Sequence, residues 1–121
     1  MATTMRVVNV SRSTELATHA VLANGFLSRL RGLLGRDGLE SGGGLVIEPC
    51  TSVHMFGMRF ALDVVHLDKH GKVLRLLPNL QPGQFGPYLW RSHTAVELPV
   101  GMIAASGTEA GDIVKLERVE G

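Results

Sequence analysis

Residues 61–77 read Ala-Leu-Asp-Val-Val-His-Leu-Asp-Lys-His-Gly-Lys-Val-Leu-Arg-Leu-Leu, and this stretch predicts a β-hairpin. Its first half, residues 61–68, is apolar on both faces of an extended chain, which is typical of a central strand covered on each side. Residues 69–71 form a short turn in which Gly71 can adopt the positive φ that a tight hairpin requires. Residues 72–77 then return as the partner strand.

Further short strands are expected on either side of this hairpin. Residues 6–10 are rich in β-branched side chains, and residues 15–21 return as the second arm of another hairpin. A helix over residues 15–21 remains an alternative, because some of its apolar residues also fit a helical period. Three more strands are expected at residues 45–47, 94–98 and 112–117, separated by segments rich in Gly and Pro such as the loop 78–90.

One segment has a clear helical pattern. Asn24 is a suitable N-cap, Gly35 is a suitable C-cap, and the apolar residues between them recur at helical spacing. Residues 102–106 can add a single helical turn. We therefore expect a compact, β-rich single domain over residues 1–121, of the α+β class. Its sheet is expected to be antiparallel or mixed and barrel-like, with one main helix at about 24–35.

The composition limits the partners and the compartment. Lys and Arg number 12 against 11 Asp and Glu, so the chain lacks the basic excess of a nucleic-acid-binding protein. Cys50 is the only cysteine, which excludes a disulfide-stapled secreted scaffold. No apolar run approaches the ~18 residues of a membrane span, and no export signal is recognisable. We expect a cytoplasmic location with neither a nucleic-acid nor a membrane partner.

Two acidic residues lie within apolar strands. Asp63 is flanked by Leu62 and Val64, and Glu97 is flanked by Val96 and Leu98. A carboxylate in such a setting must be paired, hydrogen-bonded or shifted in pKa. These acids can therefore serve acid–base chemistry, or they can be structural acids that Arg side chains or backbone N–H groups satisfy.

Soft and borderline ligand types follow each other between residues 50 and 58. Cys50, His54, Met55 and Met58 offer thiolate, imidazole and thioether groups, which suit copper(I) or zinc. Their alternative role is packing, since Met and free Cys commonly fill core space. Cys50 can also act as a nucleophile with His54 as its base. Because a zinc site needs further ligands, we expect no metal and no cofactor.

The arginines of the expected helix are candidate anion ligands. Arg31 precedes Gly32, where close backbone packing is expected, so it can pair with Asp63 or Glu97 or bind a carboxylate or phosphate in a cleft. Arg29 and Arg36 are interpreted first as solvated surface residues. The glycine run 42–44 lacks the Lys and Ser/Thr of a phosphate-binding loop and is interpreted as a turn.

Several motifs in order resemble one known family. They are residues 28–35 (SRLRGLLG), 53–71 (VHMFGMRFALDVVHLDKHG), 96–101 (VELPVG) and 107–112 (GTEAGD). Together they resemble domain of unknown function 192, also called uncharacterised protein family 0127, from about Val7 to Leu116. The resemblance implies a compact β-rich domain and no established activity.

The resemblance also implies a set of recurring polar positions, which fall here on Arg31, His54, Asp63, Asp68, Glu97 and Asp112. The chain departs from the family pattern at three positions. Gly57 and His66 stand where relatives often have an aromatic residue, and Ala61 stands where a proline is common. A ligand shared with the relatives is therefore not assumed.

We expect a non-catalytic domain that binds a small molecule or a protein. The expected site is a polar cleft lined by Arg31, His54, Asp63 and Glu97, with Met58 and Trp90 among its apolar walls. One alternative is a small hydrolase or metal-dependent enzyme that uses His54 with Asp63 or Glu97. Another alternative is thiol chemistry of Cys50 with His54.

Overall fold

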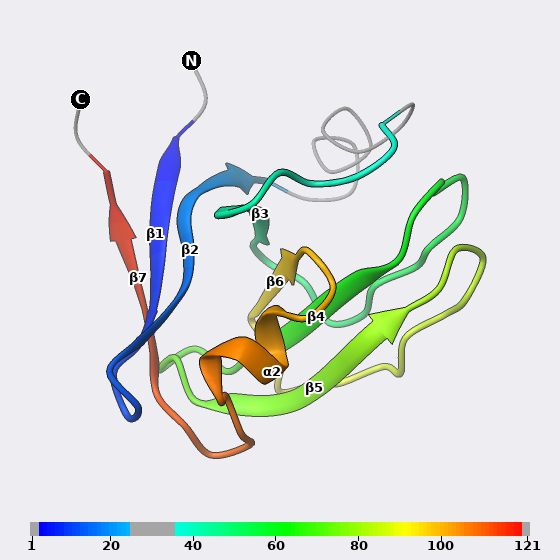
Figure 1. Cartoon of the computed structure of the whole chain (residues 1–121). Coiled ribbons are helices and arrows are strands. Elements are labelled where there is room, and N and C mark those ends of the chain that lie inside the picture. Colours follow the sequence, from blue (N-terminus) through cyan, green and yellow to red (C-terminus); the bar gives the residue numbers. More distant parts are fainter. Residues whose placement is uncertain (1–2, 25–35, 120–121) are drawn as a thin grey trace.

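The computed structural model describes residues 3–24 and 36–119 of the chain (Figure 1). These residues form seven strands and one short helix. The elements are β1 (Thr4–Asn9), β2 (Thr14–Ala23), β3 (Gly43–Ile47), β4 (Leu62–Leu67), β5 (Val73–Leu80), β6 (Thr94–Leu98), α2 (Met102–Ser106) and β7 (Val114–Arg118).

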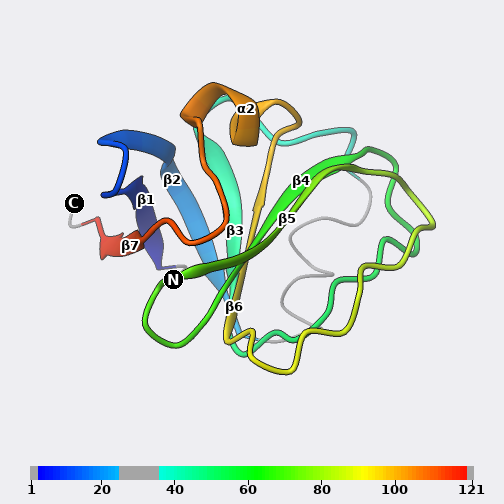
Figure 2. The same cartoon turned by 90° about the horizontal axis from the view of Figure 1, so that it is seen from below.

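All seven strands belong to one mixed sheet in the order β5-β4-β6-β3-β2-β1-β7. Neighbours are antiparallel except β2 and β3, which run parallel. Figure 2 shows that the sheet curls strongly and that α2 covers one end of it. The expected β-rich, barrel-like architecture is therefore confirmed as a half-barrel, and both expected hairpins are present.

The α+β class needs correction, because the described part of the chain is nearly all β. Its helix α2 has five residues and coincides with the helical turn expected at residues 102–106. The main helix was expected at about 24–35, and residues 25–35 of that range lie outside the described residues.

The three central strands are buried along their whole length. Every residue of β3, β4 and β6 is buried, as the continuous apolar run in residues 61–68 predicted for a central strand. Two apolar clusters cover the opposite faces of these strands. One contains Val65 with Ile103 of α2, and the other contains Val64 with Met55 of the loop before β4.

Strand β5 extends beyond the residues that the sequence predicted. The prolines of residues 78–90 predicted a loop from Pro78 onward, yet the strand continues through Pro78 to Leu80. Because β5 is the edge strand of the sheet, the missing N–H of proline is tolerated there. The register against β4 shifts by one residue at this point, and Asn79 has a φ of 53°, which identifies a β-bulge.

The two edge strands approach each other at one corner of the sheet (Figure 1). The backbone N–H of Val73 donates to the carbonyl oxygen of Asp112 at 2.8 Å, and the N–H of Val114 donates to that of Gly71 at 2.8 Å. A Cβ atom on Gly71 would lie 2.5 Å from the carbonyl oxygen of Val114. The glycine of the central hairpin turn is therefore needed for this partial closure of the barrel.

Two loops run alongside each other at the other end of β4. Met55 N–H donates to the carbonyl of Gln84, and Leu89 N–H donates to the carbonyl of Thr51, at 2.9 and 2.8 Å. The paired loops carry four large exposed aromatic side chains, namely Phe56, Phe85, Tyr88 and Trp90.

In the described part of the chain, no helix is long and apolar enough to cross a bilayer.

Candidate functional site

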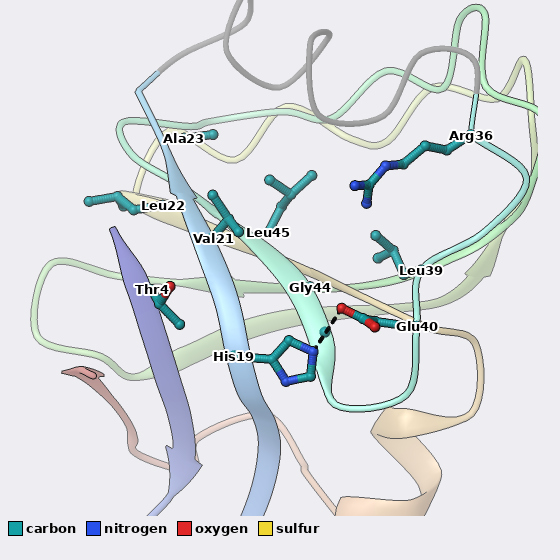
Figure 3. Close-up of a pocket in the computed structure, with 11 residues that line it drawn as sticks. Thr4, His19, Val21, Leu22, Ala23, Arg36, Leu39, Glu40, Gly44 and Leu45 are labelled. Atoms are coloured by element: carbon teal, nitrogen blue, oxygen red, sulfur yellow. Dashed lines mark hydrogen bonds and ion pairs between the residues drawn. The ribbon is translucent and has the colours of Figure 1, made fainter. Parts of the chain in front are cut away.

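A cavity of about 450 Å³ lies against the parallel pair β2–β3. Figure 3 shows that its walls come from these two strands on one side and from the segment 36–40 on the other. We call it the β2–β3 pocket. Its described lining consists of Thr4, His19, Val21, Leu22, Ala23, Arg36, Leu39, Glu40, Gly43, Gly44 and Leu45.

The parallel register positions the pocket floor. His19 of β2 lies beside Gly43 of β3, and Val21 lies beside Leu45, so these side chains share one face of the sheet. A Cβ atom on Gly43 would lie 3.1 Å from both the carbonyl oxygen and the Cγ atom of Glu40. The glycine run therefore lets the chain leading into β3 pass close to the sheet and bring Glu40 to His19.

His19 is held through both of its ring nitrogens. Its Nε2 atom lies 3.0 Å from Oε1 of Glu40, and its Nδ1 atom lies 2.8 Å from Oγ1 of Thr18. The His19 and Glu40 side chains are both substantially exposed, so this contact adds little stability. Its consequence is geometric, because it fixes the imidazole and engages the carboxylate at one end of the pocket (Figure 3).

Arg36 carries the positive charge of the pocket. In Figure 3 its guanidinium group points inward over Leu39 and Leu45. No hydrogen bond or ion pair joins Arg36 to another residue of the described chain, whereas Glu40 is engaged by His19. A cation with five N–H donors therefore faces an apolar wall and has its hydrogen-bonding capacity available for a ligand.

The apolar wall of the pocket continues into the core. Leu45 and Ala23 belong to the same buried cluster as Met55, and Leu39 packs against that cluster. The described lining of the pocket thus combines a surface of aliphatic side chains with the guanidinium group of Arg36. Such an arrangement can bury the hydrocarbon part of a small molecule while a guanidinium group binds its anionic end.

Asp63 has a structural environment. Its side chain is 1% exposed, and its carboxylate accepts three backbone N–H bonds, from Asn79 at 2.9 Å, Gly101 at 3.1 Å and Ile103 at 2.9 Å. The acid therefore joins the β5 bulge to the start of α2. A buried carboxylate requires hydrogen-bond donors, and these three N–H groups provide them. Asp63 therefore does not line a cleft open to solvent.

Glu97 and Asp63 lie on opposite faces of the sheet. The β4–β6 register places Asp63 opposite Leu98 and Val64 opposite Glu97. Directly opposed residues project to the same face and successive residues alternate, so the two carboxylates point in opposite directions. Glu97 is 0% exposed. The expected polar cleft therefore cannot contain both acids, and its fourth member, Arg31, lies outside the described residues.

Cys50 and His54 both line a smaller cavity of about 240 Å³. The Cys50 Sγ atom donates a hydrogen bond to the carbonyl of Ser52 at 3.2 Å. His54 packs edge-on against Phe85, with ring centroids 5.2 Å apart. Thiol chemistry here stays a prediction.

The remaining predicted positions are separated from the β2–β3 pocket. Met58 does not line the pocket but is buried in the same cluster as Leu45 and Met55, and Trp90 lines a third cavity near the β4–β5 turn. Within residues 3–24 and 36–119, no group of three or more His, Cys, Asp or Glu side chains is arranged to hold a metal ion. The sequence-predicted residues are therefore spread over several places.

Two acids from the recurring positions hold turns. Oδ2 of Asp112 accepts bonds from Arg12 Nε at 2.9 Å, Asn9 Nδ2 at 3.0 Å and Glu109 N at 2.9 Å. The bond from Arg12, followed by those from Asn9 and Glu109, lowers the pKa of Asp112 to about 2. A hydrogen bond from the backbone N–H of Lys72 likewise lowers the pKa of Asp68.

Sequence reasoning missed His19, Glu40 and the inward orientation of Arg36. Arg36 and Glu40 lie in a connecting segment and His19 is a polar residue within β2, and solvated side chains are ordinary at such positions. The only local signal was the glycine run 42–44, which indicates close backbone approach but not what approaches. Parallel pairing of β2 with β3 is what brings these three residues together.

Two solved structures share this fold. A protein of unknown function from Novosphingobium aromaticivorans is 20% identical, with a TM-score of 0.78 over 94% of this chain and 84% of that chain. A "putative transcription regulator" from Sinorhizobium meliloti is 18% identical, with a TM-score of 0.75 over 96% of this chain and 94% of that chain. At these identities the similarity concerns the fold alone.

No curated protein matches the chain. The sequence profile of domain of unknown function 192, described as "Uncharacterized ACR, COG1430", matches residues 7–116. This range includes β2 to β6 in full and parts of β1 and β7, the described lining of the β2–β3 pocket except Thr4, and the recurring polar positions at residues 31–112. The chain therefore belongs to the domain of unknown function 192 family, for which no function is established.

Proposed function

We propose that the protein is a non-catalytic binding domain whose β2–β3 pocket takes a small molecule with an apolar body and one carboxylate. The observation that carries the proposal is the guanidinium group of Arg36, which faces the aliphatic wall and has no ion-pair partner among the described residues. Guanidinium and carboxylate groups match in geometry and form paired charge-assisted hydrogen bonds.

The charge of the pocket favours a monoanion. Arg36 supplies one positive charge, and the negative charge of Glu40 is already in contact with His19. A phosphate dianion would bring a second negative charge near Glu40, and the described lining offers no second Lys or Arg to balance it. A carboxylate matches the one positive charge that Arg36 contributes to the described lining, and its hydrocarbon chain can cover Leu39 and Leu45.

The arrangement supports binding in preference to catalysis. A general base for a bound ligand must direct a nitrogen or oxygen atom at the proton that it removes from that ligand. Both ring nitrogens of His19 contact Thr18 and Glu40. The described lining also contains no serine or cysteine that could act as a nucleophile.

Thermal unfolding with a homologous series of ligands tests the proposal. Straight-chain carboxylates from acetate to octanoate are added to the wild-type protein, and the matching alcohols serve as uncharged controls. We expect the melting temperature to rise with carboxylate chain length and concentration, because a ligand of the native state stabilises it by about 2.7 kcal/mol at one hundred times its Kd.

Arg36→Gln is the variant that separates the site from non-specific effects. It should keep the melting temperature of the wild type without ligand and lose most of the shift caused by octanoate. Arg118→Gln removes an exposed arginine of β7 and should keep the full shift. Equal shifts with octanol and octanoate, or an unchanged response of Arg36→Gln, would contradict the proposed carboxylate site.

A further inference from the structure

We propose a second binding site, separate from the β2–β3 pocket, for an aromatic ring that carries a phosphate group, as in a mononucleotide. The site is a cavity of about 430 Å³ between the β4–β5 turn and the segment before β6. We call it the Trp90 pocket. Its described lining consists of Asp68, Lys69, His70, Trp90, Arg91, Ser92 and His93.

The two walls of the Trp90 pocket are fastened to the sheet. The backbone N–H of His93 donates to the carbonyl of Leu67 at 2.8 Å, at the end of β4. Ser92 is buried, and its hydroxyl lies 2.8 Å from Nδ1 of His66 and donates to the carbonyl of Cys50 at 2.7 Å. The segment that presents Trp90 is therefore held in place by side-chain and backbone bonds to buried residues.

Trp90 offers a platform for a planar ligand. The residue is 70% exposed, although burying an indole is strongly favourable. The guanidinium group of Arg91 lies 4.8 Å from the ring centroid and covers the indole by a cation–π contact. Among the described residues no other ring stacks on this indole, so a flat ligand can add to the Trp90–Arg91 stack.

The Trp90 pocket also carries positive charge. Lys69 and Arg91 form no ion pair within the described residues, and both line the cavity. The carboxylate of Asp68 also lines the cavity, and its Oδ1 atom is held by the turn, where it accepts the backbone N–H groups of His70 at 2.8 Å and Lys72 at 3.0 Å. The described lining therefore carries two cations with free donors against one carboxylate, and this net positive charge suits a phosphate group.

The exposed indole and the two cations together indicate a single ligand that has both an aromatic ring and a phosphate group. A ring alone would not need two flanking cations, and a phosphate alone would not need an exposed indole. A base stacked on an aromatic side chain with its phosphate on Lys and Arg uses both features. A nucleic-acid strand is a poorer match, because it requires a continuous basic track, and the whole chain has a formal charge of only +1.

Trp90 is the only tryptophan of the chain, so its fluorescence reports on this pocket directly. Adenosine 5′-monophosphate, adenosine, ribose 5-phosphate and inorganic phosphate are each titrated into the wild-type protein. We expect saturable quenching by adenosine monophosphate with a Kd in the sub-millimolar range, and at least about tenfold weaker binding of the other three compounds.

Variants measured by calorimetry, which needs no tryptophan, identify the contacts. Lys69→Gln and Arg91→Gln should each weaken the binding of adenosine monophosphate by about tenfold, and Trp90→Leu should weaken it at least as much. Arg118→Gln, outside the cavity, and Arg36→Gln, in the β2–β3 pocket, should bind as the wild type does.

Three results would overturn the assignment. The first is the absence of saturable quenching by adenosine monophosphate, and the second is equal binding of adenosine or inorganic phosphate, which would remove the need for one of the two features. The third is tighter binding of a short oligoadenylate than of the mononucleotide, which would indicate a nucleic-acid strand. None of these results depends on whether the β2–β3 pocket binds a carboxylate.

Discussion

At the scale of single residues, the buried polar side chains of this protein hold the backbone together. Asp63 connects three N–H groups that belong to the β5 bulge and the beginning of α2. His66 is fully buried in β4 and bonds through Nδ1 to the hydroxyl of Ser92. Because that hydroxyl donates to the carbonyl of Cys50, it accepts the Nδ1 proton, and Nε2 of His66 is the unprotonated nitrogen.

Replacing Asp63 tests its structural role. Asp63→Ala should lower the free energy of unfolding by about 3–5 kcal/mol, because three buried N–H groups lose a charged acceptor. Urea unfolding followed by circular dichroism measures this change. Asp37→Asn is the matched control, since this acid is exposed and should change stability by less than about 0.5 kcal/mol. A small effect of Asp63→Ala would show that water replaces the carboxylate.

His66 should make stability depend on pH. Burial, and secondly the charge of Arg75, lowers the pKa of His66 from 6.5 to about 4. Between these two values the unfolded chain takes up a proton that the folded chain does not, so stability is full above pH 6.5 and declines as the pH falls towards 4. Each pKa unit of separation corresponds to about 1.4 kcal/mol.

His66→Asn isolates this contribution, since its amide nitrogen can still donate to Ser92 but does not titrate. Calorimetric melting temperatures of both proteins are compared from pH 8 to pH 4. We expect the difference between wild type and variant to change below pH 6.5, with the wild type losing more. A difference that is constant across this range would mean that His66 protonates equally in both states.

At the scale of elements, the pairing of strands explains where the two pockets form. The parallel pair β2–β3 requires a crossover, and the end of that crossover, residues 36–40, supplies Arg36 and Glu40 to the β2–β3 pocket. The hairpin β4–β5 has a short turn, and the loop entering β6 is fastened beside it, which creates the Trp90 pocket. Both pockets thus lie where connecting segments pack against rigid strands, as binding sites commonly do.

At the scale of the whole molecule, the half-barrel is partly closed by a contact between its two edges. Gly71, in the turn between β4 and β5, accepts a bond from Val114 at the start of β7. This corner joins the first and last strands of the sheet order, which otherwise have no neighbour on their outer sides. The same contact limits how far the sheet can open.

A pair of glycine substitutions measures this closure. Gly71 and Gly83 have similar φ angles, 86° and 80°, but only a Cβ atom on Gly71 would meet another backbone, at 2.5 Å from the Val114 carbonyl oxygen. Gly83→Ala should cost about 1–2 kcal/mol of unfolding free energy for the left-handed conformation alone. Gly71→Ala should cost clearly more, because the edges must also separate. Equal costs in chemical denaturation would contradict a role for closure in stability.

Much of the architecture was already determined by the order of residues along the chain. Continuous apolar runs, glycine turns and proline stops identified the strands of the sheet, because burial and backbone sterics act on each segment locally. The resemblance of four motifs identified the family. The sequence did not predict that β5 continues through Pro78, since only the edge position of this strand in the sheet makes a proline acceptable there.

The site depended on tertiary structure. Sequence analysis correctly found that Asp63 and Glu97 needed partners, but it could not show that they face opposite sides of the sheet, because that follows from the β4–β6 register. It also could not place His19, Arg36 and Glu40 together, since they are joined by a parallel pairing across a long connection. Local chemistry selects strands and turns, whereas the contacts between distant segments decide which side chains share a pocket.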